Sequence, residues 1–286
     1  MLSIGIGVAE ERKGLDVVAL GTDRRVERVL SRATVADVVA MTHELSPGVV
    51  CIDSPPAWAA DGKSRAGERE LRRLGITAFS TPTDPGDHAF YRWMRVGFSI
   101  FDAIAGDYPR FRGDAVSGTA AEVFPEATAV LLAGRLRSVD ESKIRFRRDV
   151  LDRHGVDTSG LRRVDAVDAA LAALTGVLAL AGESSFVGDS AEGVILLPVA
   201  ELPVTKLLRK PASSAGRSST RPRSVLLRAQ RPTTWCECGC GAEVRRRFLP
   251  GHDAKLRSQL RRRHLGGDEV ATERLIDLGW HDAVET

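Results

Sequence analysis

The first thirty residues alternate between branched apolar residues and small or polar ones, and this alternation predicts short strands. Residues 3–9 show the pattern most clearly. Residues 14–20 and 24–30 follow as two further strands, and the Gly-Thr-Asp between them is a turn signal. The three segments predict a meander that opens the fold.

A helical pattern comes next. Thr34 can cap a helix that runs to Leu45, because apolar residues recur at helical spacing before Pro47-Gly48 ends the segment. Residues 49–52, Val-Val-Cys-Ile, predict a buried strand that ends at Asp53. Three meandering strands, a helix and a buried fourth strand are the opening order of the RNase H-like fold. We therefore expect an α/β protein with an RNase H-like mixed sheet flanked by helices.

The chain then alternates helical and strand patterns up to about residue 204. Strands are expected at 120–124 and 193–199. The spacing of apolar residues predicts helices over 64–74, 88–106, 125–134, 140–154 and 164–182.

The composition changes after Pro203. Residues 209–234 are rich in Arg, Ser, Pro and Thr, which is typical of a flexible linker. A cysteine cluster follows, and then a basic helix is expected over 255–263 and a short amphipathic helix over 269–278. We expect three parts, namely an RNase H-like body (1–204), a basic linker (205–234) and a small Cys/His module (235–286).

The net charge of +3 hides an uneven distribution. Residues 206–263 hold sixteen Lys and Arg against three acids, whereas the rest of the chain is acidic. This pattern favours contact with a polyanion, so nucleic acid is the expected partner. A solvated linker in an Arg-rich chain is the alternative.

No targeting or membrane segment is visible in the sequence. The first nine residues lack the basic part and the longer apolar part of a signal peptide. The longest apolar run, 169–181, is shorter than the roughly 20 residues that span a bilayer. We expect a cytoplasmic protein without membrane contact. The oligomeric state and the choice between DNA and RNA are not predicted.

Several motifs in the body resemble those of one family. In chain order they are IDSPPAW (52–58), SRAGERELRRLGI (64–76), AEVFPEA (121–127), Lys143, VDAVDAALAALTG (164–176) and EGVILLP (192–198). Over residues 2–204 they resemble the predicted-nuclease family catalogued as domain of unknown function 429, in the RNase H-like superfamily. The resemblance implies a hydrolase that cleaves nucleic-acid phosphodiesters with the help of a metal.

Metal-dependent cleavage of a phosphodiester needs clustered carboxylates. Asp53 and Asp168 are the expected catalytic ligands of Mg or Mn, which prefer oxygen donors. Asp165 lies three positions before Asp168 on the same helix, and Glu122 is the fourth candidate. Each also has a structural alternative, since Asp precedes proline in turns and acids favour the start of a helix.

The resemblance fails at one position. The family's first strand reads Gly-Ile-Asp, with that Asp central to metal binding, whereas this chain has Gly7 there. Two hypotheses follow: a metal-dependent nuclease, or a non-catalytic nucleic-acid-binding protein that keeps the fold. A third hypothesis, a sugar-kinase-type phosphotransferase, needs a duplicated domain and glycine-rich ATP motifs, and we find neither.

Basic residues of the body match charged positions of the family. Arg65, Arg69 and Lys143 are expected to face phosphate, with solvated surface as the alternative.

A second candidate site lies near the C-terminus. Cys236, Cys238, Cys240 and His252 can complete a tetrahedral zinc site, with free thiols as the alternative. This stretch resembles small Cys/His modules of actinobacterial and phage proteins. Two basic triplets flank it and are expected to contact nucleic acid: Arg245, Arg246 and Arg247, and Arg261, Arg262 and Arg263.

Overall fold

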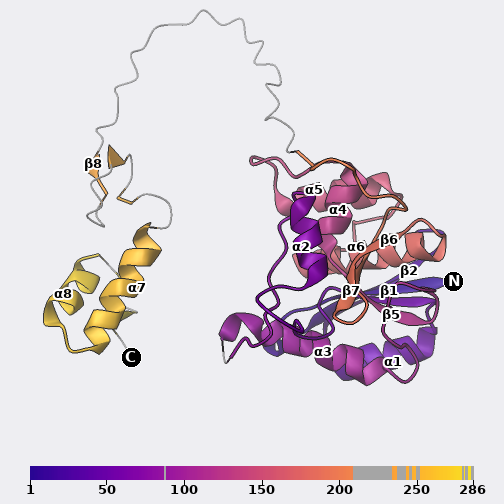
Figure 1. Ribbon diagram of the computed structural model, residues 1–286, viewed down its shortest axis with the longest axis horizontal. Helices are drawn as coiled ribbons and strands as arrows, with labels where there is room; N and C mark the ends of the chain where they lie inside the picture. Colours follow the sequence, from indigo (N-terminus) through magenta and orange to yellow (C-terminus); the bar gives the residue numbers. More distant parts are fainter. Residues whose placement is uncertain are drawn as a thin grey trace, which may run out of the picture. The chain divides into compact units, whose positions relative to one another are not determined.

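The computed structural model describes residues 1–86, 88–208, 234–236, 243–244, 247–248, 252–278, 280 and 283–284. The chain divides into two compact units, Met1–Gly216 and Arg217–Thr286 (Figure 1). Each unit has an apolar core of its own.

A mixed sheet forms the centre of the first unit. Among the described residues its seven strands are β1 (Leu2–Gly7), β2 (Leu15–Gly21), β3 (Val26–Ala33), β4 (Val49–Ile52), β5 (Thr119–Val123), β6 (Ser185–Asp189) and β7 (Gly193–Leu197). Their order across the sheet is β3-β2-β1-β4-β5-β7-β6. β1, β2 and β3 are antiparallel neighbours, β4 and β5 continue parallel to β1, and β6 and β7 form a hairpin. An antiparallel meander whose first strand pairs with parallel strands is the RNase H-like arrangement.

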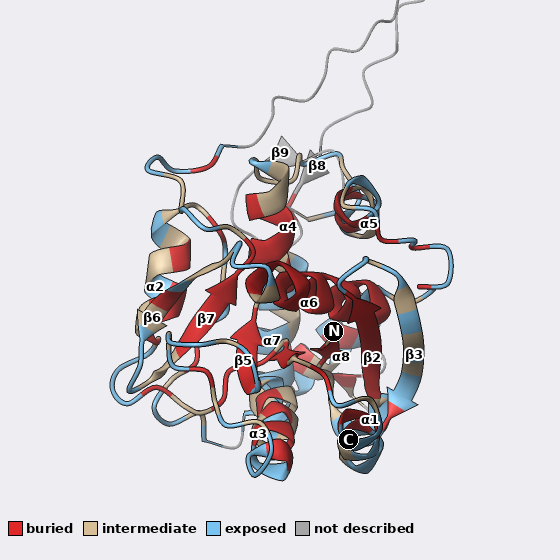
Figure 2. Cartoon of the chain, turned by 90° about the vertical axis from the view of Figure 1, so that its right-hand side faces the viewer, coloured by how far each residue is buried: buried red, intermediate tan, exposed pale blue. Residues whose placement is uncertain are grey.

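Helices cover both faces of the sheet (Figures 1 and 2). They are α1 (Val35–Leu45), α2 (Ala66–Arg73), α3 (Arg92–Ile104), α4 (Pro125–Ala133), α5 (Lys143–Arg153) and α6 (Val164–Leu180), with 3-10 turns η1 (Glu11–Lys13) and η2 (Ala89–Tyr91). One apolar cluster joins α1 and α3 to the sheet face that carries Ile4 and Ile6. Another joins α4, α5 and α6 to the opposite face, which carries Val18 and Leu20.

Helix α1 begins where the sequence predicts it to begin. The hydroxyl of Thr34 accepts a hydrogen bond from the Asp37 N–H at 3.2 Å. In return, the Asp37 carboxylate accepts one from the Thr34 N–H at 2.8 Å. This capping box satisfies donors that the first turn of a helix leaves unpaired.

Helix α6 lies directly on the backbone of β1. A Cβ added at Gly7 would lie 2.5 Å from the carbonyl oxygen of Asp165, and one added at Gly5 would approach the Ala169 carbonyl more closely still. Real Cβ contacts of this kind stay above 3.0 Å, so only glycine fits at both positions. Because sheet and helices pack on opposite sides of it, α6 is buried on nearly every face (Figure 2).

The elements predicted for the body are confirmed within a few residues, with one omission. The helix expected over 88–106 opens as η2 and continues as α3 to Ile104. No sequence pattern indicates β6, an edge strand in which only Val187 is buried and Phe186 is 42% exposed. The short mixed pattern of β6 explains the omission, because sequence patterns detect long alternations best.

The end of the body lies a few residues beyond the predicted boundary at 204. The Leu207 N–H donates to the Leu74 carbonyl at 2.9 Å, and the Leu136 N–H donates to the Leu208 carbonyl at 3.1 Å. Leu207 is part of the larger apolar core. Residues 205–208 therefore pack against the body.

The second unit contains a small helical core. Strands β8 (Thr234–Trp235) and β9 (Glu243–Val244) pair antiparallel, and helices α7 (His252–Leu265) and α8 (Glu269–Asp277) follow. The helices bury Leu260, Ala271 and Leu275 against each other. Both helices expected in this part of the sequence are present, and α7 begins three residues earlier than expected. Among the described residues, no helix is both long and apolar enough to cross a membrane.

Candidate carboxylate site

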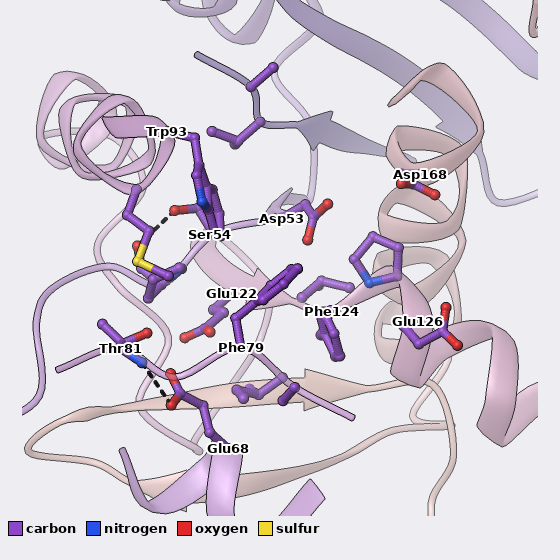
Figure 3. Close-up of a pocket in the computed structure, with 18 of the residues that line it drawn as sticks. Asp53, Ser54, Glu68, Phe79, Thr81, Trp93, Glu122, Phe124, Glu126 and Asp168 are labelled. Atoms are coloured by element: carbon purple, nitrogen blue, oxygen red, sulfur yellow. Dashed lines mark hydrogen bonds between the residues drawn. The ribbon is translucent and has the colours of Figure 1, made fainter. Parts of the chain in front are cut away.

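A cavity of 580 Å³ opens at the carboxyl ends of the parallel strands β4 and β5 (Figure 3). Parallel strands end at the same edge of a sheet, so residues that follow them meet there. The start of α6 and parts of α2, α3, α4 and α5 complete the wall. The ionisable side chains that line the cavity are Glu10, Lys13, Asp53, Arg65, Glu68, Glu122, Glu126, Arg137, Lys143, Arg147, Asp165 and Asp168.

Asp53 follows β4 directly and its carboxylate faces the cavity (Figure 3). The Asp53 N–H donates to the carbonyl of Ile6 at 2.9 Å, which extends the pairing of β4 with β1. Burial raises the pKa of Asp53 well above its usual range, and the nearby charge of Asp168 raises it further. Arg147 and Lys143 partly offset that rise. Asp53 is therefore a carboxylate whose negative charge is poorly compensated by the protein.

Asp168 projects from α6 toward the same cavity (Figure 3). Arg147 on α5 forms an ion pair with Asp168 and also with Glu126 of α4, the latter at 2.7 Å. Burial raises the pKa of Asp168, and Arg147 and Lys143 oppose this rise. Asp165, one turn earlier, is 41% exposed and lies 3.6 Å from Arg163. Arg147 thus ties three helices together at the cavity wall.

A second buried ion pair closes the other end of the cavity. The Arg65 guanidinium donates to both oxygens of Glu122, at 2.7 and 2.5 Å, and its Nε donates to Glu68 at 3.2 Å. Burial raises the pKa of Glu122, and Arg65 counteracts it. Although burial opposes the charged form of Arg65, Glu122 and Glu68 raise its pKa. All three side chains are nearly inaccessible to solvent.

The four predicted carboxylates therefore line one cavity without forming one ligand cluster. Asp53 and Asp168 face each other across it (Figure 3), whereas Glu122 is held by Arg65. In the part of the chain that the structure describes, no group of three or more His, Cys, Asp or Glu side chains is placed to hold a metal ion.

Of the three basic residues that were expected to face phosphate, one does not. Arg65 is 1% exposed and all three guanidinium nitrogens donate to carboxylates, so it is a structural ion-pair partner instead of a phosphate-facing residue. Arg69 is exposed on α2, where its guanidinium donates to the Ser64 carbonyl. Lys143 is exposed at the start of α5 and lines the cavity.

Sequence reasoning missed a buried acid beside Gly7. Asp16 on β2 is the direct cross-strand partner of Gly7, and its side chain is fully buried. The guanidinium of Arg163, the residue before α6, approaches the Asp16 carboxylate at 3.3 Å. Burial raises the pKa of Asp16. Its place in an alternating strand, on the face that packs against α6, was the available signal.

Arg147 was missed for a different reason. The chain has 41 Lys and Arg residues, and nothing in the sequence around position 147 sets this one apart. Its role depends on α4, α5 and α6 meeting in space.

The C-terminal candidate site is only partly within the described residues. Cys236 is buried, and its Sγ lies 3.9 Å from Nδ1 of His252. Arg261 and Arg262 are exposed on α7, whereas Arg263 forms an ion pair with Asp268 at 2.7 Å. Arg247 is also exposed. Outside the described residues lie Cys238, Cys240, Arg245 and Arg246.

The strand order and the cavity define an α/β protein of RNase H-like topology with a carboxylate pocket at the carboxyl edge of its sheet. The chain belongs to the family described as "Protein of unknown function (DUF429)", which matches residues 7–192.

Other comparisons give more distant likenesses. No curated protein matches the chain. Among solved structures, it is similar to Thermus thermophilus RuvC at 15% sequence identity and a TM-score of 0.35, over 64% of this chain and 97% of that one. The same values hold for T. thermophilus RuvC in complex with a Holliday junction substrate, with 96% of that chain covered.

Proposed function

We propose that this protein is a metal-dependent nuclease that binds one divalent cation, Mg or Mn, between Asp53 and Asp168. The observation that carries this proposal is the pairing of two carboxylates across one cavity, with Asp168 buried and Asp53 half-buried. Burial and, after it, the charge of Asp168 raise the pKa of Asp53, so a cation shared by the two acids would stabilise both carboxylates. Arg147 and Lys143 offset the raised pKa of Asp53 only in part, so a bound cation would stabilise the charged form of this acid.

The donor set fits one ion better than two. Mg²⁺ is commonly held by one or two carboxylates and completes its octahedron with water and substrate phosphate. Asp53 and Asp168 supply two such donors, and Asp165 lines the same cavity one turn before Asp168 on α6. A second ion would need the first-strand carboxylate, and α6 occupies the space above Gly7. When bound, the ion would stabilise negative charge that develops on the phosphate during cleavage.

The chain's own residues have separate tasks in this proposal. Lys143, exposed at the cavity rim, would pair with a phosphate oxygen and orient the scissile group. Arg147 holds Asp168 in place through their ion pair, and Glu126 holds Arg147. Arg65 and Glu122 keep the cavity floor rigid.

A cleavage assay tests the proposal. Labelled single-stranded, duplex and junction DNA and single-stranded RNA are incubated with the full chain and either Mg²⁺, Mn²⁺ or EDTA. Asp53→Asn and Asp168→Asn should abolish cleavage, because each removes a charge that holds the ion. Asp61→Asn, at an exposed loop position, is the control and should retain full activity. Cleavage that survives Asp53→Asn would locate the activity elsewhere.

A second function is favoured by the contact between Gly7 and α6. The loss of the first-strand acid is built into the helix packing, so a nucleic-acid-binding protein without catalysis is the competing proposal. In that case the wild type would bind nucleic acid and remain inert with every divalent ion. Isothermal titration of Mn²⁺ would separate the two, since only the nuclease proposal requires binding that Asp53→Asn removes.

For the C-terminal unit we propose a structural zinc ion bound by Cys236, Cys238, Cys240 and His252. Zinc ligands at about 2.3 Å (sulfur) and 2.0–2.1 Å (nitrogen) in a tetrahedron lie roughly 3.6 Å apart. The 3.9 Å between Cys236 Sγ and His252 Nδ1 is close to that spacing. Elemental analysis of reduced full-length protein should find one zinc per chain, and Cys236→Ser should lower it. Metal-free protein with unchanged α7 and α8 helicity would contradict this assignment.

We also propose that the basic segment 206–263 strengthens binding to nucleic acid through counterion release. A chain that ends at Leu208, which keeps the residues packed on the body, should bind more weakly and with a smaller salt dependence. Equal affinity of the two chains would show that the segment is only a linker.

A further inference from the structure

A basic groove lies beside the carboxylate cavity on the first unit. It has a volume of 1190 Å³ and is formed by the turn after β1, the end of β3, the start of α1, α3 and the residue before α6. Two acids, Glu10 and Glu11, line it, against six basic side chains: Arg12, Lys13, Arg32, Arg92, Arg95 and Arg163. Arg12 forms an ion pair with Glu10 at 3.1 Å, and Arg163 forms one with Asp16 at 3.3 Å. The basic side chains that line the groove still outnumber its acids by four, so the groove favours a polyanion.

Helix α3 supplies one wall of the groove through its periodicity. Arg92, Arg95, Val96 and Ser99 line the groove, at the spacing that places residues on one face of a helix. Arg92 and Arg95 are both exposed. The guanidinium of Arg95 lies 5.6 Å from the Trp58 ring centroid and donates to the Gly86 carbonyl, so its position is fixed from two sides.

A backbone irregularity supplies the opposite wall. The register between β2 and β3 shifts at Leu15/Asp16, which leaves Arg32 outside the ladder. Arg32 has φ +58°, in the left-handed region that non-glycine residues rarely adopt, and it faces Gly14 with φ +69°. Such strain persists only where the surrounding structure imposes it, and it often marks a functional position. The bulge places an exposed arginine in the groove.

The groove and the carboxylate cavity adjoin each other. Glu10 and Lys13 line both of them. On the cavity side, Trp93 of α3 joins Phe79 in the wall (Figure 3). A nucleic-acid strand that lies in the groove would therefore pass η1 before it reaches Asp53.

Exposed aromatic rings lie on the cavity side of α3. Phe79 and Phe90 are 56% and 42% exposed, and their rings meet edge to face at 5.4 Å. Trp93 contacts Phe79 in the same manner at 6.1 Å. Large apolar rings held in water by their neighbours are typical of surfaces on which unpaired bases stack, because every base offers a π-face.

We infer that this protein binds single-stranded nucleic acid across α3, with phosphates in the basic groove and unpaired bases on the ridge of Phe79, Phe90 and Trp93. The direction of the strand into the carboxylate cavity rests on the proposed nuclease function. The binding itself does not depend on cleavage. A duplex would pair its bases and leave the aromatic ridge without a role.

The test measures binding to the full chain in EDTA, so that cleavage cannot interfere. Fluorescence anisotropy follows a labelled single strand and the matching duplex at several salt concentrations. Arg12→Ala/Arg92→Ala should lower the slope of log affinity against log salt by about 1.4, or roughly 25-fold in affinity at 0.1 M salt, from about 0.7 per phosphate contact. Phe79→Ala/Phe90→Ala should weaken single-strand binding by roughly 5- to 150-fold and duplex binding far less.

Two matched controls define the refuting results. Arg73→Ala/Arg153→Ala removes the same charge from exposed positions outside the groove and should leave the slope unchanged. Arg12→Lys/Arg92→Lys keeps the charge and should restore the slope. A groove variant with the slope of the Arg73/Arg153 control would overturn the groove assignment. Duplex binding as tight as single-strand binding, with no effect of the ring substitutions, would overturn the single-strand assignment.

The outcome is independent of catalysis. If no condition yields cleavage but the groove and ring variants lose binding as expected, the nuclease proposal fails and this inference stands. If cleavage is found and the groove variants bind like wild type, the nuclease proposal stands and this inference fails.

Discussion

The contact between Gly7 and α6 predicts that this glycine cannot be replaced without moving the helix. A Cβ at position 7 would lie 2.5 Å from the Asp165 carbonyl oxygen and 3.3 Å from the carbonyl carbon. Both atoms belong to the helix backbone, so no side chain can rotate away. Because real Cβ contacts stay above 3.0 Å, α6 has to retreat from β1 by at least 0.5 Å along its first turn.

The expected cost of Gly7→Ala follows from that displacement. Overpacking a tight interior costs about 1–3 kcal/mol. For a unit of this size each kcal/mol lowers Tm by about 2–4 °C, so Tm should fall by roughly 2–12 °C. Gly5→Ala should cost more, because its Cβ would press harder on α6. Gly7→Asp should be worse than Gly7→Ala, since it also buries a carboxylate next to Asp16.

Thermal unfolding followed by far-ultraviolet circular dichroism measures these changes. Gly106→Ala is the control, because a Cβ at Gly106 would have open space around it, and it should be neutral or stabilising by about 0.4–1 kcal/mol. If Gly7→Ala melts at the same temperature as Gly106→Ala, the close packing of α6 on β1 is wrong. If Gly7→Asp is stable and gains cleavage activity, there is room for the first-strand acid after all.

Three further predictions concern buried ionisable groups. Arg147→Met leaves the buried carboxylate of Asp168 without its arginine partner and also removes the partner of the half-buried Glu126. The free energy of unfolding in a urea titration at pH 7 should therefore fall by about 3–5 kcal/mol, and a loss below about 1 kcal/mol would contradict the role given to Arg147. Burial raises the pKa of Asp16 in the folded state above its ordinary value of 3.8, which applies to the unfolded state. The folded protein therefore binds the carboxyl proton of Asp16 more firmly than the unfolded chain does. The stability that Asp16 contributes is present below pH 3.8 and is lost as the pH rises through the raised pKa of the folded state. Asp16→Asn should therefore raise Tm at pH 7 and leave it unchanged at pH 4. An equal change in Tm at both pH values would refute this reasoning. Burial raises the pKa of the Cys51 thiol to about 12, so iodoacetamide at pH 8 should modify Cys51 only in urea, which peptide mass spectrometry can detect.

Local sequence patterns were sufficient for most of the fold. The alternation in residues 3–9 and the Thr34 cap specify their elements with neighbours only, so β1 and α1 could be predicted without knowledge of the rest. The position of Asp53 at the end of β4 followed in the same way, because a short apolar run before Asp-Ser-Pro-Pro is a local signal. Strand β6 gave no such signal, because it lies at the sheet edge and buries one side chain.

The candidate site was less predictable, because its ion pairs join residues far apart in the chain. Asp53 and Asp168 were identified from motifs, and the structure places both at one cavity. The partners of the acids could not be foreseen. Arg65 reaches Glu122 across 57 positions and Arg147 reaches Asp168 across 21, and only the packing of the helices decides which arginine meets which carboxylate.

The glycine contacts on β1 also constrain how this protein can change over evolutionary time. Once α6 lies against the strand backbone, a mutation that reintroduces an acid at position 7 meets a helix that fills its place. An acid at this position would first require substitutions that move α6 outward, and those would loosen the core to which Ala169 and Ala173 belong. Each such substitution would lower the stability of the protein before an acid at position 7 could be accommodated. The packing of α6 on β1 therefore keeps position 7 a glycine, because any side chain there has to displace the helix first.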